Sequence, residues 1–287
     1  MKHIPVLLDA VLDALGDIQN KHIVDCTFGA GGYTRAFLER GATVTAFDRD
    51  PNVLVDAELV RSEYGNRFNF IPHAFSSISM LEGAYDAIVF DLGISSMQID
   101  NGERGFSFRM DAPLDMRMDT VNLVPAAQLI EQLGVEELAS ILRNYGDVRN
   151  AMNIARAIKN AKPKTTFQLR DLIHNPKDIA PIFQALRIAV NDEMGEVERA
   201  LAVVPGLLKV GGKCICVTFH SIEDRIVKNT FRTWTTAPGD PRMPLIESAP
   251  FAAIKTALPD AKELENNSRA RSAHMRGVIK LTQGGNK

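Results

Sequence analysis

The sequence predicts an α/β protein with a Rossmann-like, mostly parallel sheet and an inserted helical subdomain. In the first half, short apolar runs alternate with helical patterns, which is typical of parallel strands joined by crossover helices. A long and mostly helical stretch then separates the fourth apolar run from the fifth. With 287 residues, 45% of them hydrophobic, the chain is large enough for a sheet domain that carries such an insertion.

The predicted strands are short apolar runs, and they lie at residues 22–28, 42–48, 68–73, 86–93, 213–219 and 274–282. Helices are expected at 34–40 and 51–64, between the first three strands. A tight turn at 209–212, with two adjacent glycines, is expected to lead into the fifth strand. A Pro-rich loop at 237–250 precedes the last strand.

The insertion is expected to span residues 109–191, so that residues 1–108 and 192–287 form the sheet domain. Its helical patterns are PAAQLIEQL, VEELASILRNYG, NAMNIARAIKNA and TFQLRDLIH. The last of these opens on Thr165 and Gln168, which have the spacing of a capping box. A helix at about 192–208 leads directly into the fifth strand, so we assign it to the sheet domain as that strand's crossover helix.

Composition does not decide which class of partner the protein binds, but it indicates the cellular compartment. A net charge of −2 gives no overall basic character, so contact with nucleic acid requires a local patch. The three cysteines, Cys26, Cys214 and Cys216, lie in apolar runs and form neither a disulfide framework nor a zinc site. No apolar run reaches the ~20 residues of a membrane span, and no signal peptide is recognisable. We therefore expect a cytoplasmic protein with neither membrane nor metal partners.

A glycine-rich turn follows the first predicted strand. Gly29, Gly31 and Gly32 let the backbone turn sharply and approach a ligand closely. Asp48 ends the second strand, nineteen residues after Gly29, which suits a carboxylate that binds ribose hydroxyls in dinucleotide or S-adenosylmethionine sites. Thr34 replaces the third glycine of the dinucleotide pattern, and no P-loop is present, so a cofactor without phosphates fits better. A turn that merely joins strand to helix is the alternative.

Asp91 ends the fourth strand, which lies beside the first in a doubly wound sheet. Ligands of such sheets bind outside the carboxyl ends of the strands, where the strand order reverses. Asp91 is therefore the candidate catalytic group at the point where substrate and cofactor meet. Its alternative role is to cap the following segment through the amides of Ser95 or Ser96.

These motifs resemble those of the bacterial RsmH family, also called MraW, whose members methylate the N4 of a cytidine in 16S ribosomal RNA. The most specific part is FDLGISSMQIDNGERGFSFRMDAPLDMRMD at residues 90–119. Further matching segments are HIPVLL (3–8), TFGAGGYT (27–34), FDRD (47–50), FQALRIAVNDEMGEVERAL (183–201), FHSIEDRIVK (219–228) and SRARSAHMR (268–276). The resemblance covers nearly the whole chain.

The resemblance implies a class I S-adenosylmethionine-dependent methyltransferase whose inserted helical domain takes part in RNA recognition. It implies that Gly31, Gly32 and Tyr33 hold the methionine portion of the cofactor and that Asp48 holds its ribose. Phe75 matches a position beside the adenine, and Asp91 and Gln98 match positions close to the bound cofactor. The implied partner is small-subunit ribosomal RNA or the assembled small ribosomal subunit. The oligomeric state is open.

The chain departs from the family inside the insertion. The family's basic stretch is replaced at residues 147–153, which keep Arg149 but lose several positive charges. An arginine-containing family segment is replaced at 177–182 by a sequence without arginine. Each lost phosphate contact weakens RNA binding and lowers its salt dependence. Two alternative functions therefore stay open: a cofactor-binding assembly factor without catalysis, and a methyltransferase with another substrate.

Several residues are candidates for contact with the substrate. Cytosine N4 is a poor nucleophile, and acceptors on its N–H groups, such as Asp91, favour the geometry needed for attack. Phe106, Phe108 and Arg109 offer planes against which a base can stack, although both rings also suit a core anchor. His220 follows the fifth strand and is either a catalytic contact or a helix cap. The expected basic patch consists of Arg225, Lys228, Arg269, Arg271 and Arg276, whose alternative role is plain solvated surface.

Overall fold

The computed structural model describes residues 5–95, 97–98, 101–237 and 248–281, without the side chains of residues 266, 268 and 269. The chain forms two compact units. Unit 1 comprises Met1–Gly93 and Met194–Lys287, and unit 2 comprises Ile94–Glu193. Unit 2 begins earlier than the 109 expected from the sequence, because Phe106 is buried in the hydrophobic core of the helical unit.

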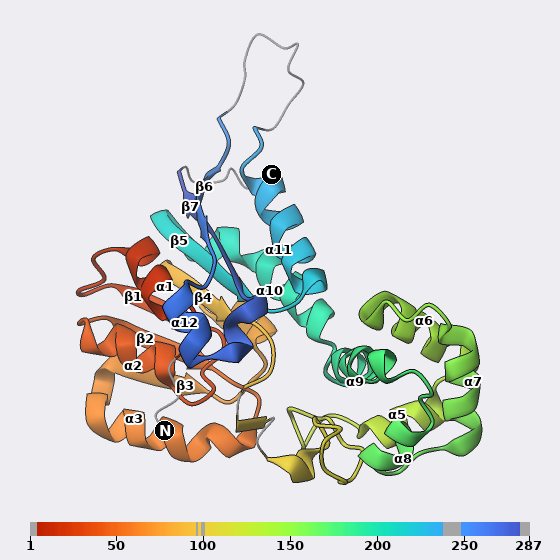
Figure 1. Cartoon of the computed structure of the whole chain (residues 1–287). Helices are drawn as coiled ribbons and strands as arrows, with labels where there is room; N and C mark the ends of the chain where they lie inside the picture. Colours follow the sequence, from red (N-terminus) through yellow and green to blue (C-terminus); the bar gives the residue numbers. More distant parts are fainter. Residues whose placement is uncertain (1–4, 96, 99–100, 238–247, 282–287) are drawn as a thin grey trace, which may run out of the picture. The chain divides into compact units, whose positions relative to one another are not determined.

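Unit 1 contains a seven-stranded sheet in the order β3-β2-β1-β4-β5-β7-β6 (Figure 1). Its strands are β1 (His22–Asp25), β2 (Thr43–Phe47), β3 (Phe68–Ile71), β4 (Tyr85–Asp91), β5 (Leu208–Thr218), β6 (Phe251–Ala257) and β7 (His274–Lys280). The first five strands are parallel, and β7 and β6 are added antiparallel at one edge. The prediction that the first and fourth strands are adjacent is confirmed, so the strand order reverses between β1 and β4.

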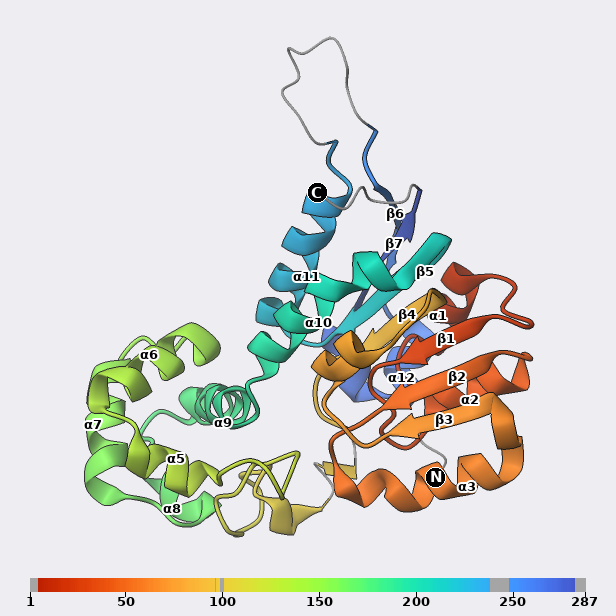
Figure 2. The same ribbon diagram turned by 180° about the vertical axis from the view of Figure 1, so that it is seen from behind.

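Helices cover both faces of this sheet, as Figures 1 and 2 show. They are α1 (Leu8–Leu15), α2 (Gly32–Glu39), α3 (Leu54–Tyr64), α10 (Glu193–Leu207), α11 (Ser221–Trp234) and the short α12 (Ala261–Asn266). The first three helices contribute to one buried cluster, which includes Val11, Phe37 and Val60. Helices α10 and α11 contribute to a second cluster, on the other face, through Leu201 and Val227. The apolar residues that α1, α2, α3, α10 and α11 bury are thus packed against the strands.

The sheet differs from the sequence prediction in two places, at residues 209–212 and after residue 250. Residues 209–212 do not form a separate turn but a bulge inside β5, because Leu208 pairs with Tyr85 and Lys213 pairs with Ala87. The Pro-rich loop at 237–250 lies mostly outside the described residues, which resume at 248. Strand β6 and helix α12 follow it and were not predicted; β6 is an edge strand in which only Phe251 is buried.

Two lysines of the sheet bind the ends of distant helices. Lys280 of β7 donates its Nζ hydrogens to the carbonyl oxygens of Pro205 and Leu208, at 2.6 and 2.8 Å, where α10 ends. Lys213 of β5 donates in the same way to Ala14 and Leu15 at the end of α1, both at 2.8 Å. A cation stabilises the carbonyl groups that a helix C-terminus leaves unpaired. Burial lowers the pKa of both lysines.

Unit 2 is helical, as predicted for the insertion. Its helices are α5 (Ala126–Gln132), α6 (Val135–Gly146), α7 (Ala151–Ala161), α8 (Thr166–Asp171) and α9 (Pro176–Asn191). They enclose a hydrophobic cluster that includes Leu138 and Leu142. Thr165 caps α8 by accepting from the Gln168 N–H at 3.3 Å, but Gln168 accepts from Lys164, so the predicted capping box is only half formed. No helix among the described residues is long and apolar enough to span a membrane.

Candidate functional site

The glycine turn connects β1 to α2, and each glycine has its own structural reason. Gly29 and Gly31 have φ values of +52° and +75°, which favour glycine. A Cβ atom on Gly31 would lie 3.0 Å from the Phe28 ring, and one on Gly32 would collide with the ring of Pro5. Beside Gly29 the nearest atom to such a Cβ would be 4.0 Å away, so a ligand can approach the backbone there.

Asp48 joins the end of β2 to this turn. One carboxylate oxygen accepts from the Gly29 N–H at 2.8 Å, and the other accepts from the Asp50 N–H at 2.9 Å. Burial raises the pKa of Asp48, against these two hydrogen bonds, which lower it. Each oxygen retains a second lone pair. Asp48 can therefore hold the turn and still accept hydrogen bonds from ribose hydroxyls.

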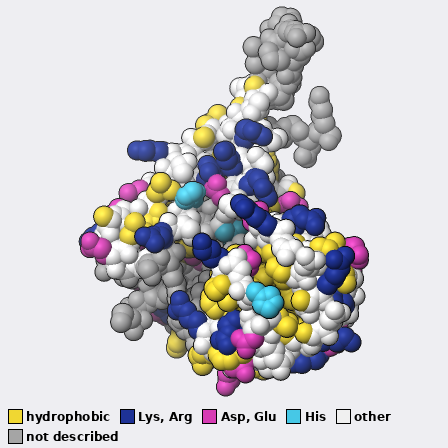
Figure 3. All heavy atoms as spheres, turned by 45° about the vertical axis from the view of Figure 1, so that its right-hand side comes forward, with side chains coloured by type: hydrophobic (Ala, Val, Ile, Leu, Met, Phe, Trp, Pro, Cys, Tyr) yellow, Lys and Arg dark blue, Asp and Glu magenta, His cyan; other side chains and the backbone are white. Residues whose placement is uncertain are grey.

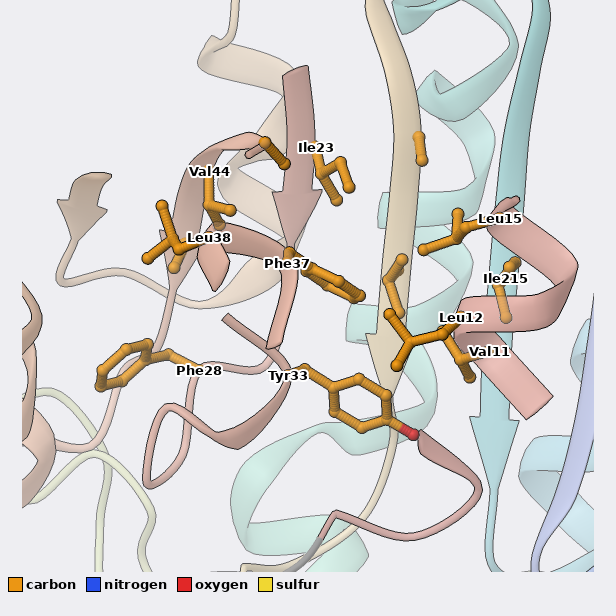
Figure 4. Close-up of a cluster of buried hydrophobic side chains, with 14 of the residues drawn as sticks. Val11, Leu12, Leu15, Ile23, Phe28, Tyr33, Phe37, Leu38, Val44 and Ile215 are labelled. Atoms are coloured by element: carbon orange, nitrogen blue, oxygen red, sulfur yellow. The ribbon is translucent and has the colours of Figure 1, made fainter. Parts of the chain in front are cut away.

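The N-terminal segment before α1 is fastened against the turn. The hydroxyl of Tyr33 donates to the carbonyl of Val6, and Glu263 of α12 accepts from the Leu7 N–H at 2.5 Å. The Tyr33 ring is only 3% exposed and lies among the side chains of α1 and α2, as Figure 4 shows. Any contact of Tyr33 with a cofactor must therefore come from its backbone. The sequence carried no signal for the contact with Glu263, because it joins residues 256 positions apart.

A chain of hydrogen bonds connects the ends of β1 and β4. The Thr27 N–H donates to Asp25 at 3.1 Å, and the Thr27 hydroxyl oxygen accepts from the Asp91 N–H at 2.7 Å. The second oxygen of Asp25 accepts from the hydroxyl of Thr34 at 2.6 Å. Burial raises the pKa of Asp25 to about 6, against the hydrogen bonds from Thr34 and Thr27. Thr34, which replaces the third glycine, thus ties α2 to β1.

Asp91 lies at the carboxyl end of β4, where the sequence places it. Its Oδ1 atom is buried and has no hydrogen-bond partner in the described part of the chain. Burial, reinforced by the nearby charges of Asp25 and Glu223, raises the pKa of the Asp91 carboxyl well above its usual range. A buried polar atom without a partner is destabilising unless a ligand satisfies it. Asp91 is therefore suited to accept a hydrogen bond from a bound molecule or to neutralise a positive charge on it.

His220 precedes α11 and caps its N-terminus, which is the second of the two roles that the sequence suggests. Its Nδ1 accepts from the Glu223 N–H at 3.4 Å. Its Nε2 lies 2.8 Å from a carboxylate oxygen of Glu223, although the two are not aligned as a hydrogen bond. The other oxygen of Glu223 accepts from the Phe219 N–H at 3.0 Å. Sequence analysis missed Glu223, although a carboxylate three residues after a cap is itself a helix-start signal.

The remaining predicted cofactor residues lie in different units. Phe75 begins a short 3-10 helix (Phe75–Met80) in unit 1, and its ring packs edge-on against Phe90 with centroids 5.8 Å apart. Gln98 lies in unit 2, where it is 6% exposed and its Oε1 accepts from the Ser95 N–H at 3.0 Å. Ser95 thus pairs with Gln98. Within unit 1 the structure brings together the glycine turn, Asp48 and Asp91.

The predicted base-stacking residues lie in unit 2. Phe106 is 9% exposed and belongs to the helical core, and Phe108 packs edge-on against Phe183 with centroids 5.5 Å apart. Both rings therefore anchor the loop that carries them. Arg109 is exposed, and its N–H donates to the Ser107 hydroxyl oxygen at 3.2 Å. Of the three, Arg109 is the residue whose side chain is available to a substrate.

The predicted basic patch is only partly available. Arg225, Lys228 and Arg271 are exposed. Arg276 instead forms a two-bond ion pair with Asp224, at 2.7 and 2.9 Å, which raises the pKa of Arg276 and lowers that of Asp224. The side chain of Arg269 lies outside the described residues.

A glycine turn after β1, a carboxylate after β2 and a buried acid after β4 lie on a Rossmann-like sheet. Together they define a class I S-adenosylmethionine-dependent methyltransferase. The chain matches the model of the MraW methylase family over residues 1–281, and it belongs to that family.

Two curated relatives carry the name ribosomal RNA small subunit methyltransferase H. The protein of Bartonella bacilliformis is 42% identical, over 96% of this chain and 88% of the relative. The protein of Brucella anthropi is 44% identical, over 98% and 88% of the two chains. Among solved structures, the chain is similar to an rRNA methylase from Streptococcus thermophilus, with 13% identity, a TM-score of 0.45 and coverage of 98% and 99%. It is also similar to a putative methyltransferase from Streptococcus mutans in complex with SAH, with 13% identity, a TM-score of 0.46 and coverage of 97% and 100%.

Proposed function

We propose that the protein methylates the exocyclic N4 of a cytidine in the 16S RNA of the small ribosomal subunit. The names of the relatives support the RNA substrate. The buried Oδ1 of Asp91, which lacks a partner in the described part of the chain, carries the proposal for the site. This substrate also favours the cytoplasm as the compartment.

The proposed cofactor residues are Gly29, Gly31, Gly32, Tyr33, Asp48, Phe75, Asp91 and Gln98. The S-adenosylmethionine they would hold supplies a methyl group on a positively charged sulfur. A site with several buried carboxyl groups suits a cation. A nearby positive charge favours the ionised carboxylate and offsets the free-energy cost of its desolvation. The donor set of unit 1 therefore fits this cofactor.

Asp91 acts on the amino group of the target base in this proposal. As a carboxylate it accepts a hydrogen bond from an N4–H, which orients the nitrogen lone pair toward the methyl carbon. If the methyl group were transferred to N4, its bond to the sulfur would break, S-adenosylhomocysteine would leave without the sulfur charge, and the N4–H group, now positively charged, would become acidic. The environment of Asp91 then again favours its protonated form, so its carboxylate can take the N4 proton.

The helical unit 2 is the proposed RNA-recognition domain, with Arg109 as a contact for the target base. Two positions at which the chain departs from the family, Val148 and Ile182, are only 2% and 0% exposed. Other residues of the same two segments, such as Asp147, Asn153 and Lys177, are exposed. The departures therefore change the surface of unit 2 as well as its core, and the proposed RNA substrate rests on the names of the relatives.

Transfer of labelled methyl groups to small subunits from cells that lack the gene tests the proposal. We expect transfer by the wild type, and a loss of at least about 100-fold for Asp91→Asn, in line with the loss of a positioned polar group. Asp86→Asn, at the opposite end of β4, is the control and should stay active. N4-methylated cytidine that persists in ribosomal RNA after deletion of the gene would refute the substrate. Absence of any transfer would favour the assembly-factor alternative, and full activity of Asp91→Asn would refute the role of Asp91.

A further inference from the structure

Helix α11 begins directly after His220, at the carboxyl end of β5. The candidate site lies at the same ends of the parallel strands. One side of the helix is buried through Glu223, Val227 and Phe231, which follow one another at intervals of four residues. The opposite side is exposed and carries Arg225, Lys228 and Arg232. Residues at these spacings share one face of a helix. We call these three residues the basic stripe.

The carboxylates of α11 do not neutralise the basic stripe. Asp224 is engaged by Arg276 through two hydrogen bonds, and Glu223 is 1% exposed on the buried side. In the described part of the chain, the side chains of the three stripe residues take part in no ion pair or side-chain hydrogen bond that would occupy them. Three positive charges are thus presented together to the solvent.

The overall charge of the protein does not produce this feature. The net charge is −2, and Figure 3 shows basic side chains mixed with acidic and hydrophobic ones over one face. A local arrangement of like charges is instead the expected footprint of a polyanion site on a protein without general basic character. A solvated helix face usually mixes both signs of charge, as α3 does with Glu58 and Arg61.

The spacing of the stripe suits a nucleic-acid backbone. At ~1.5 Å per residue, Arg225 and Arg232 are about 10 Å apart along the helix axis. One strand of duplex DNA carries a phosphate roughly every 3.4 Å along its axis, so a backbone with spacing of this order places about three phosphates along the stripe. We propose that the basic stripe binds the phosphates of the ribosomal RNA strand next to the methylated base. This inference rests on the proposed function, because it assumes that the substrate is RNA.

Salt dependence of binding measures such contacts directly. A single-stranded site loses about 0.7 in the slope of log K against log salt for each phosphate contact removed, and a duplex about 0.9. The variant Arg225→Gln/Lys228→Gln/Arg232→Gln should therefore have a slope that is shallower by about 2 to 3. Its affinity for small subunits at low salt should also fall, because the three contacts are lost.

The matched control removes three positive charges from unit 1 outside the stripe. Lys21, Arg61 and Lys255 are exposed, and their triple replacement by glutamine should leave the slope at the wild-type value within about 0.5. Binding of small subunits from cells that lack the gene is measured from about 50 to 200 mM salt for all three proteins. Cofactor affinity, measured by calorimetry, confirms that each variant is folded.

A wild-type slope in the stripe variant would overturn the proposal, and so would an equal loss in the control, since only net charge would then matter. Methyl transfer by the wild type is measured in the same preparation. If the wild type transfers no methyl group, the proposed function fails whatever the slopes are. If it transfers the methyl group and the stripe variant keeps its slope, only the role of the stripe fails.

Discussion

Replacing Asp25 by asparagine should make the protein more stable at pH 8 than the wild type, and the gain should disappear at pH 4. Asp25 is 0% exposed and has a pKa of about 6 in the folded protein, against 3.8 for an ordinary aspartate. Burial is the main cause, and the nearby charge of Asp48 adds to it. The folded state thus holds the proton more tightly than the unfolded chain does.

The sign and the size of the effect follow from these two pKa values. Well below pH 3.8 Asp25 is protonated in both states and does not contribute to the pH dependence. As the pH rises to about 6 the unfolded chain ionises first, so the free energy of unfolding falls. At ~1.4 kcal/mol per pKa unit, the loss is about 3 kcal/mol and is complete near pH 7. Asparagine has no proton to lose and avoids it.

Urea unfolding of the cofactor-free protein between pH 4 and pH 8 measures this difference. The amide loses part of the contact with Thr34, which lowers stability by about 1 kcal/mol at every pH. The quantity to compare is therefore the change between the two pH values. Asp86→Asn is a control whose pH dependence should have the opposite sign. Burial raises the pKa of Asp86, but the hydrogen bonds from Lys209 and His22 bring this pKa below its usual value. Relative to the wild type, the Asp86→Asn variant should therefore lose stability as the pH rises. A difference between wild type and Asp25→Asn that stays constant with pH would refute the reasoning.

Three further predictions concern the site and the two units. Affinity for S-adenosylmethionine should rise from pH 5 to pH 8 more steeply than affinity for S-adenosylhomocysteine, which lacks the sulfur charge, because burial raises the pKa of Asp91; equal pH dependence in calorimetry would contradict this. Lys280→Met should lower the free energy of unfolding by about 2 to 4 kcal/mol, since two carbonyl groups lose a charged donor, and a loss below about 0.5 kcal/mol would show that water replaces it. Gly105→Ala should destabilise the protein by at least about 2 kcal/mol, because φ is +72° and the Cβ would collide with a backbone carbonyl. Gly65→Ala, with φ of +56° and open space around it, is the comparison and should have a smaller effect in the same unfolding assay.

Local sequence patterns determined most of the parallel half of the sheet. The runs that became β1, β2 and β4 are apolar because both faces of a parallel sheet are buried, and this property is visible along the chain. The glycine turn and Asp48 were recognisable for a similar reason. A backbone with positive φ and a carboxylate at the next strand end are requirements that few residue types meet.

Contacts between distant residues decided the rest. Strand β6 exists because β7 offers it an antiparallel edge, and the bulge at 209–212 exists because Tyr85 pairs across it. Neither partner is visible within a window of sequence. The inward direction of Tyr33 depends on Val6, and the start of unit 2 at Ile94 depends on the burial of Phe106 among helices that follow it in the chain.

The protonation of the site is the clearest case of a property that only the tertiary structure decides. The sequence alone identified Asp91 as the acid at the end of the fourth strand, because strand ends meet at one edge of a parallel sheet. It did not reveal that Asp25 and Glu223 would approach Asp91 in a buried place. A pKa depends on desolvation and on the distances between charges, and both arise only when strands and helices from distant parts of the chain pack together.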